Sequence, residues 1–119
     1  MQYEYNGNLL EEDRINLVAK EIITTYPEIP IDKAKESAML EGRISIDCNL
    51  EMVFTRLYNI MLIMSNDKSI VKRVYMDLFN ILNANQNDEK IYYYYQILEE
   101  IHNFLNSERN FPLLDEFQY

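Results

Sequence analysis

The sequence predicts an all-α fold: an antiparallel bundle of four to five helices with a C-terminal tail that packs back on it. Apolar residues make up 48% of the 119 residues, which is enough to build a buried core. Only two glycines and three prolines interrupt the chain, too little turn chemistry for a sheet of many short strands. Apolar residues recur at helical spacing, which favours helices. A length of 119 residues is that of one domain, so a single domain over residues 1–119 is expected. The first eight residues are expected to be flexible, and residues 107–119 to form the tail.

A first helix is expected over residues 9–26, because both of its ends carry clear signals. Asn8 and Glu11 form a variant of the capping box, in which two side chains satisfy free backbone amides at a helix start. Pro27 and Pro30 then end the helix, since proline removes a backbone donor and clashes with the preceding turn. The apolar side chains at helical spacing are Ile15, Val18, Ala19, Ile22 and Tyr26.

The middle of the chain predicts a short helix followed by an unusually apolar one. Residues 32–41 form the short helix, with Gly42 as a left-handed cap. After a connector, the third helix covers residues 50–64, and either Asp47 or Asn49 caps it. Its apolar residues extend nearly round the helix, which is typical of a buried, central helix. They are Val53, Phe54, Leu57, Ile60, Met61, Leu62, Ile63 and Met64.

Two further helices are expected in the second half of the chain. The fourth covers residues 68–82 with Asp67 as its N-cap, and the fifth covers residues 89–106 with Asn87 or Asp88 as its N-cap. The inward-facing residues of the fourth helix are Ile70, Val71, Val74, Tyr75, Leu78, Phe79, Ile81 and Leu82. The apolar residues of the tail, which are expected to pack back, are Phe111, Leu113, Leu114 and Phe117.

Four consecutive tyrosines stand near the start of the fifth helix. On a helical wheel of about 100° per residue, Tyr94 and Tyr95 point into the bundle. Tyr93 lies at the boundary of that face, and Tyr92 points outward. An exposed tyrosine offers a large contact area at a low cost in conformational entropy. Tyr92 and Tyr93 are therefore candidate partner-binding residues.

The only histidine, His102, falls on the apolar face of the fifth helix, so we expect it to be partly buried with its polar atoms satisfied. Glu99 and His102 form a Glu-x-x-His pair, a motif that di-iron helical bundles use twice. A second histidine is missing from the sequence, so a metal site would need carboxylates alone, or His102 together with Cys48. We therefore expect no metal ion and no cofactor.

The sequence also lacks the usual signs of catalysis. A Ser-His-Asp or Cys-His arrangement would have to use His102, and no motif surrounds Cys48. Two isolated glycines cannot form a phosphate-binding loop. Adjacent acids such as Glu99 and Glu100 diverge on a helix instead of converging on a substrate. We expect that the protein is not an enzyme.

Charge is the most informative bulk property. The formal net charge is −9, and the excess of acid lies in residues 1–49 and 84–119. Nucleic-acid binding requires Lys and Arg to neutralise phosphates, so a nucleic-acid partner is not expected. An acidic surface favours encounter with a protein partner that has a basic surface. The candidate acidic contact residues are Glu11, Glu12, Glu99 and Glu100.

A basic patch of Lys68, Lys72 and Arg73 is the exception to this trend. On the helical wheel these side chains fall away from the apolar face of the fourth helix. One interpretation is that they form salt bridges with acidic parts of the chain. The other is that they bind a small anion or an acidic partner. The sequence leaves both open.

A cytoplasmic protein without membrane contact is expected. The single cysteine excludes an intrachain disulfide, and the N-terminus lacks the basic and apolar regions of a signal peptide. The longest apolar-rich stretch, residues 50–64, is too short to span a bilayer and contains Glu51 and Arg56.

These observations favour a small acidic, non-catalytic protein–protein interaction module. It would act as an inhibitor, an immunity-type protein or a prophage regulatory protein, through the tyrosine-bearing helical face. The alternative is a self-associating structural or scaffold protein, because six methionines and an apolar third helix could form a homodimer interface. A third class is a helix-turn-helix DNA-binding regulator, but its recognition helix at residues 50–64 would carry one arginine and many apolar residues.

Overall fold

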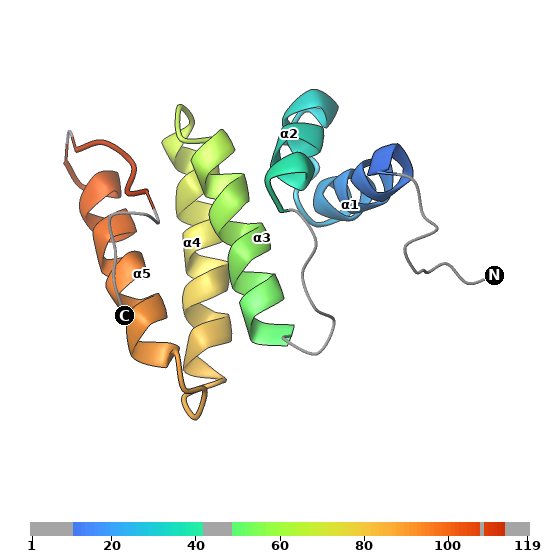
Figure 1. The fold of residues 1–119 in the computed structure, drawn as a ribbon. Coiled ribbons are helices and arrows are strands. Elements are labelled where there is room, and N and C mark those ends of the chain that lie inside the picture. Colours follow the sequence, from blue (N-terminus) through green and yellow to red (C-terminus); the bar gives the residue numbers. More distant parts are fainter. Residues whose placement is uncertain (1–10, 42–48, 108, 114–119) are drawn as a thin grey trace. The chain divides into compact units, whose positions relative to one another are not determined.

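The computed structural model describes residues 11–41, 49–107 and 109–113 (Figure 1). Within these residues the chain forms five α-helices and no strand. The prediction of an all-α fold is therefore confirmed. The helices are α1 (Glu11–Thr25), α2 (Ile31–Glu41), α3 (Asn49–Ile63), α4 (Lys68–Asn83) and α5 (Ile91–Leu105).

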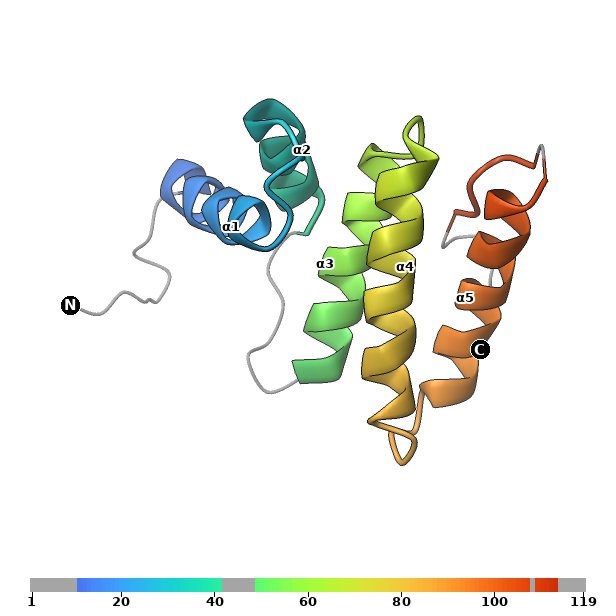
Figure 2. The same cartoon turned by 180° about the vertical axis from the view of Figure 1, so that it is seen from behind.

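The helices group into two compact units. One contains α1 and α2, and the other contains α3, α4 and α5. In the second unit consecutive helices run antiparallel, as Figure 1 and the opposite view in Figure 2 show. The bundle prediction is thus confirmed for the helices of this unit, whereas the prediction of a single domain stays a prediction.

In the first unit, α1 packs directly on α2. Ala34 and Ala38 of α2 have no exposed surface, so these small side chains allow the helices to approach closely. The Arg14 guanidinium on α1 links the two helices, since it donates to the carbonyl of Ala38 at 3.3 Å and pairs with Glu11 at 2.6 Å. Both helices lie within two residues of their predicted bounds. The predicted caps Asn8 and Gly42 lie outside the described residues.

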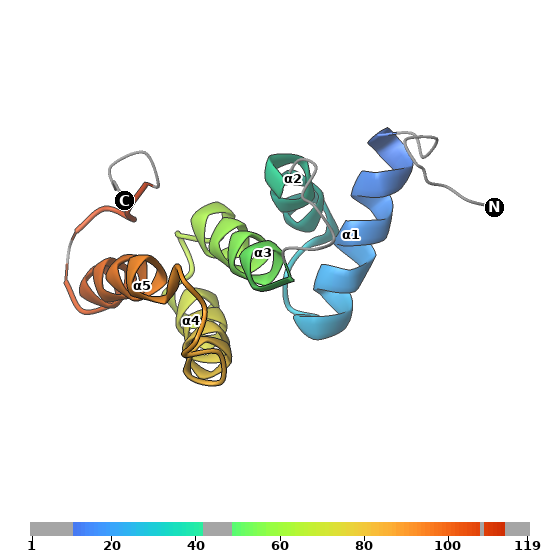
Figure 3. The same cartoon turned by 60° about the horizontal axis from the view of Figure 1, so that its bottom comes forward.

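In the second unit, α4 packs against both α3 and α5 (Figure 3). Each of the three helices contributes large apolar side chains that are at least nine-tenths buried, and burying one such side chain stabilises the fold by about 1.5–3 kcal/mol. Phe54 of α3 and Tyr94 of α5 stack with 4.4 Å between ring centroids, which joins the outer two helices directly. The rest of this core is formed by Leu57, Tyr58, Ile60, Met61, Ile70, Val71, Val74, Leu78, Leu82, Ile91, Ile97, Leu98, Ile101 and Phe104.

The two turns of this unit are stabilised by different hydrogen bonds. Asp67 caps α4 as predicted: its Oδ1 accepts hydrogen bonds from the backbone amides of Ser69 at 3.2 Å and Ile70 at 3.4 Å. The prediction of a side-chain cap on α5 is wrong, because α5 begins after Lys90 and no side chain caps it. Asp88 accepts a hydrogen bond from the Lys90 amide at 2.8 Å and so stabilises the preceding turn.

The C-terminal tail packs back on this unit, as predicted, up to Pro112. The Phe111 ring lies 5.5 Å from the ring of Tyr58 and 5.4 Å, edge-on, from that of Phe104. The buried Tyr58 hydroxyl donates to the carbonyl of Pro112 at 2.6 Å. For Leu113 the prediction is wrong, because its side chain is 45% exposed. The predicted tail residues Leu114 and Phe117 lie outside the described residues.

Candidate functional site

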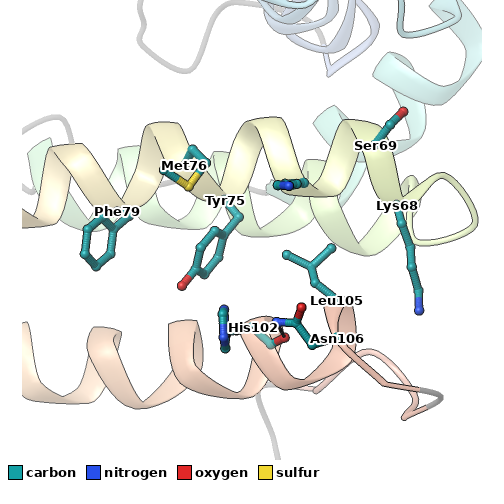
Figure 4. Close-up of a pocket in the computed structure, with 9 residues that line it drawn as sticks. Lys68, Ser69, Tyr75, Met76, Phe79, His102, Leu105 and Asn106 are labelled. Atoms are coloured by element: carbon teal, nitrogen blue, oxygen red, sulfur yellow. Dashed lines mark hydrogen bonds between the residues drawn. The ribbon is translucent and has the colours of Figure 1, made fainter.

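A groove lies between α4 and α5. Its volume is about 550 Å³, and side chains from both helices line it (Figure 4). From here on it is called the α4–α5 groove. Its principal lining residues are Lys68, Lys72, Tyr75, Phe79, His102 and Leu105.

Aromatic rings form the middle of the groove. Tyr75 and Phe79, one turn apart on α4, stack with 6.3 Å between their centroids. Tyr75 also lies 6.0 Å from the imidazole of His102, and Figure 4 shows the two rings facing each other from opposite helices. Burial raises the pKa of the Tyr75 hydroxyl above its usual value, because desolvation disfavours the phenolate.

The prediction that Tyr75 and Phe79 belong to the core is wrong. Tyr75 is only half-buried, and Phe79 is 36% exposed. The buried face of α4 is centred between Val71, Val74 and Leu78. Tyr75 lies roughly 70° and Phe79 roughly 110° from the centre of that face, so they form its edge and the wall of the groove.

The expected burial of His102 is also wrong, because its side chain is exposed in the groove. The buried face of α5 extends toward Ile97 and Phe104, and its centre lies roughly 70° from Ile91 on the helical wheel. His102 therefore falls at the edge of this face. Its ring nitrogen Nε2 has a partner as expected: the Asn106 amide nitrogen lies 3.1 Å from it and also donates to the backbone carbonyl of His102 at 2.9 Å.

Two lysines give one end of the groove a positive charge. The Lys68 ammonium donates to the carbonyl of Ser107 at 2.9 Å and lies 4.9 Å from the centroid of the Phe104 ring. Lys72 lines the same end one turn further along α4. Arg73, the third predicted basic residue, is exposed but does not line the groove. The structure thus brings together two of the three residues of the predicted patch.

The groove continues toward the other end of α5 as a smaller cavity of about 250 Å³. The two cavities share Tyr75, Phe79 and His102. Glu99 lines the smaller cavity, so the concavity has a cationic end and an anionic end. Tyr95 also lines it, half-buried, and its hydroxyl accepts a hydrogen bond from Gln86 at 2.6 Å. Tyr95 is therefore a rim residue, and its prediction as a core residue is wrong.

The other tyrosines of the run lie where the helical phase predicts. Tyr94 is 3% exposed and stacks on Phe54, whereas Tyr92 is 83% exposed. Tyr93 is half-buried at the boundary, with its ring 5.9 Å from that of Tyr94. One residue of the run is thus displayed almost completely to solvent.

The predicted acidic contact residues fall into two groups. Glu99 lies two turns after Tyr92 on the same side of α5, and Glu100 stands in the same relation to Tyr93. Glu100 forms an exposed ion pair with Arg109 at 3.5 Å. Glu11 and Glu12 are exposed on α1, in the other unit, where Glu11 pairs with Arg14.

Sequence reasoning missed the groove, although a signal for it is present. Positions 68, 72, 75 and 79 follow the i, i+4, i+7, i+11 spacing that places residues along one stripe of a helix. The stripe consists of two lysines followed by two aromatic residues. Assigning the aromatic pair to the core and the lysines to the opposite side concealed this stripe. Met76 and Asn106 also line the groove and were not singled out.

Within the described residues, no group of three or more His, Cys, Asp or Glu side chains is placed to hold a metal ion. Cys48 lies outside the described residues. None of the described helices combines the length and the apolar character needed to cross a membrane.

Comparison with known proteins provides no information about the site. No protein-family model, no curated protein and no solved structure matches this chain.

Proposed function

We propose that this protein is a small non-catalytic interaction module that docks the tyrosine-bearing face of α5 on a basic surface of a protein partner. The observation that carries the proposal is the 83% exposure of Tyr92, two turns before the exposed Glu99 on the same side of the helix. A tyrosine displayed in this way supplies a rigid, amphipathic contact at little entropic cost.

The acids beside Tyr92 support a basic partner. Glu99 forms no ion pair with any described residue, so its charge is available to a cation of the partner. The pair of Glu100 with Arg109 is exposed on both sides, and such surface pairs contribute little stability. Glu100 can therefore give up this ion pair and contact a cation of the partner instead. The net charge of −9 adds long-range attraction, which accelerates encounter with a basic surface.

The role that fits this mode of action is an inhibitor, an immunity-type protein or a prophage regulatory protein in the cytoplasm. Each of these works by occupying a surface of its partner, and none needs a reacting group. A helix-turn-helix regulator is less favoured, because α3 would be its recognition helix. Five apolar residues and Asn59 of α3 are buried, and Glu51 is its one acidic residue.

The test is a direct affinity measurement with a partner that is cross-linked in the native host, identified by mass spectrometry and purified. The double variant Tyr92→Ala/Glu99→Gln should bind roughly tenfold more weakly or worse, because truncating a central aromatic contact typically costs this much. The matched control is Leu113→Ala/Glu36→Gln, which also removes one exposed large side chain and one exposed carboxylate. Equal affinity of the α5 variant and the unaltered protein would rule out this face.

The alternative, self-association, is favoured by a different observation. The α1–α2 unit exposes four large apolar side chains to more than half of their full extent, whereas single exposed apolar residues are ordinary. No large apolar side chain of α3 is comparably exposed, so the expected interface on the third helix is replaced by one on α1 and α2. The four residues are Leu17, Ile31, Met39 and Leu40.

Light scattering distinguishes the two functions. A self-associating protein gives a mass that rises with concentration above the 14.3 kDa of one chain, and Met39→Ala/Leu40→Ala lowers this mass. The interaction module gives a constant mass over the same range. Because the two sets of variants lie on different helices, each result stands without the other.

A further inference from the structure

The cationic end of the α4–α5 groove holds two like charges, and no carboxylate of the described residues neutralises them. Lys68 and Lys72 are one turn apart on α4, and like charges at this spacing repel each other. Neither forms an ion pair with a carboxylate of a described residue. The nearest acid in sequence, Asp67, has its carboxylate engaged by Ser69, whose hydroxyl donates to it at 2.7 Å. In a protein with a net charge of −9, this is a local site that favours an anion.

This end of the groove is also held in place before any ligand arrives. The ammonium of Lys68 is fixed by the Ser107 carbonyl and by the face of Phe104, and two of its three hydrogens remain to be donated. On the facing helix, Asn106 and His102 are joined by a hydrogen bond from the amide to the backbone. Preorganisation of this kind reduces the entropy that binding has to overcome.

Beyond the lysines the groove is mainly apolar. The rings of Tyr75, Phe79 and His102 form its middle, and Met76 and Phe79 are 45% and 36% exposed. The rise of an α-helix places Lys72 and Phe79 about 10 Å apart along the axis of α4. The larger cavity, at about 550 Å³, falls within the range of about 300–1,000 Å³ that is typical of small-ligand sites. An elongated apolar body of this length therefore fits.

We propose that the α4–α5 groove is a binding site for a small amphiphilic carboxylate, with its carboxylate at Lys68 and Lys72 and its apolar body along the aromatic wall. This site goes beyond the proposed docking of α5, because it uses the stripe of α4. The glutamate at the far end, Glu99, sets the orientation, since it repels the carboxylate and leaves the lysines as its one attractive end. An apolar cation of the same length is repelled by the two lysines and should not bind.

The only histidine of the chain supplies a direct reporter of the site. His102 lines both cavities, so its imidazole proton resonances can be followed without assigning the rest of the spectrum. The probe is decanoate, titrated below its micelle concentration at constant pH and ionic strength. We expect a saturable shift of the His102 resonances with decanoate. Acetate, which lacks the apolar body, and decyltrimethylammonium, which reverses the charge, should give no saturable shift.

Variants then assign the two ends of the ligand. Lys72→Glu should weaken decanoate binding roughly tenfold, because it replaces an attractive charge by a repulsive one. The control Lys35→Glu makes the same change at an exposed lysine on α2 and should leave the affinity unaltered. Phe79→Ala should weaken binding roughly fivefold through lost apolar contact, while decanoate retains its preference over the cation. Circular dichroism establishes that each variant has kept its helical content.

Several results would overturn the proposal. One is the absence of a saturable His102 shift with decanoate on the unaltered chain, a result that no folding defect can explain. Another is equal binding of decanoate and decyltrimethylammonium, or equal affinity of Lys72→Glu and Lys35→Glu. Binding to vesicles with anionic headgroups, or to an acidic peptide, in place of free decanoate would also reject the small-ligand site. None of these results bears on Tyr92, so the docking function stands or falls separately.

Discussion

The hydroxyl of Tyr58 forms a hydrogen bond that holds the C-terminal tail on the α3–α5 unit. It is buried, and it donates a hydrogen bond to the carbonyl of Pro112, 54 residues away in the sequence. A buried carbonyl that loses its donor is costly, because neither water nor another group replaces the bond. The order of the tail up to Pro112 therefore depends on one phenolic oxygen and on the ring packing beside it.

Tyr58→Phe should lower the free energy of unfolding by about 1–2 kcal/mol, since it removes this donor and keeps the ring. Urea denaturation followed by circular dichroism measures the change. Tyr92→Phe is the matched control, because the hydroxyl of Tyr92 is on an 83% exposed side chain. Equal destabilisation by the two substitutions would show that the bond to Pro112 contributes nothing.

Asp67 makes stability depend on pH in acid solution. The Ser69 hydroxyl and then the Ile70 amide donate to its carboxylate, which lowers the pKa of Asp67 below its ordinary value. The folded state therefore binds the proton more weakly than the unfolded chain does. The stabilisation is fully present above the ordinary pKa of about 3.9 and is lost as the pH falls through the lower pKa of the folded state.

Asp67→Ala should accordingly lower the thermal midpoint at neutral pH, because α4 loses its N-cap. The difference from the unaltered chain should shrink as the pH falls below the ordinary range of the carboxyl. Thermal melts at a series of pH values measure both effects. A difference that stays constant down to strongly acidic pH would contradict the role assigned to the charged carboxylate.

At the scale of helices, the sequence predicted well where each helix begins and ends. It predicted less well which side of a helix is buried. Pro27, Pro30 and Asp67 mark boundaries that hold within two residues, because these residues act on the backbone locally. Whether Tyr75 or His102 is buried depends on which neighbour packs against which side of the helix. That information resides in contacts between helices, so periodicity within one helix cannot supply it.

The same distinction explains how much of the candidate site was foreseen. The exposure of Tyr92 and the burial of Tyr94 follow from phase alone, since they lie near the centres of opposite faces. The charges of Lys68 and Lys72 point to an anion site from the sequence alone, whereas their association with His102 depends on how α4 and α5 pack. Residues near the boundary between two faces turn either way with a small rotation of the helix, and these residues form the groove.

Two phenylalanines test the boundary of the core directly. Phe54 is 2% exposed and stacks on Tyr94, whereas Phe79 is 36% exposed at the groove. Phe54→Ala should lower the free energy of unfolding by about 3–5 kcal/mol, because it leaves a cavity among packed rings. Phe79→Ala should cost about 1 kcal/mol or less, since solvent already reaches this side chain. Chemical denaturation measures the free energy of unfolding of both variants. Equal losses would show that Phe79 belongs to the core.

At the scale of the whole molecule, the two units differ in the size of their cores. The α1–α2 unit spans residues 1–44, and its two helices expose four large apolar side chains. Chains of only about 40 residues bury too little surface to be more than marginally stable without a disulfide, a metal or a partner. The α3–α5 unit has three mutually packed helices, a capped turn and a tail that covers Phe104 and Tyr58.

Separate peptides should therefore behave differently. Residues 45–119 should retain helical circular dichroism and a cooperative thermal transition, whereas residues 1–44 should show little stable helix at micromolar concentration. Mixing the two peptides and measuring the helical signal tests whether one supports the other. A cooperative transition in the peptide of residues 1–44 alone would contradict this expectation.

The ring of Phe104 contacts both the groove lysine Lys68 and the tail residue Phe111. One face lies under the ammonium of Lys68, while Phe111 approaches the same ring edge-on. A substitution that pulls Phe111 away therefore frees the ring to tilt, and the ammonium above it follows. Truncation of the chain before Phe111 should thus change the affinity of the α4–α5 groove for anions, although none of the described residues that it removes lines the groove.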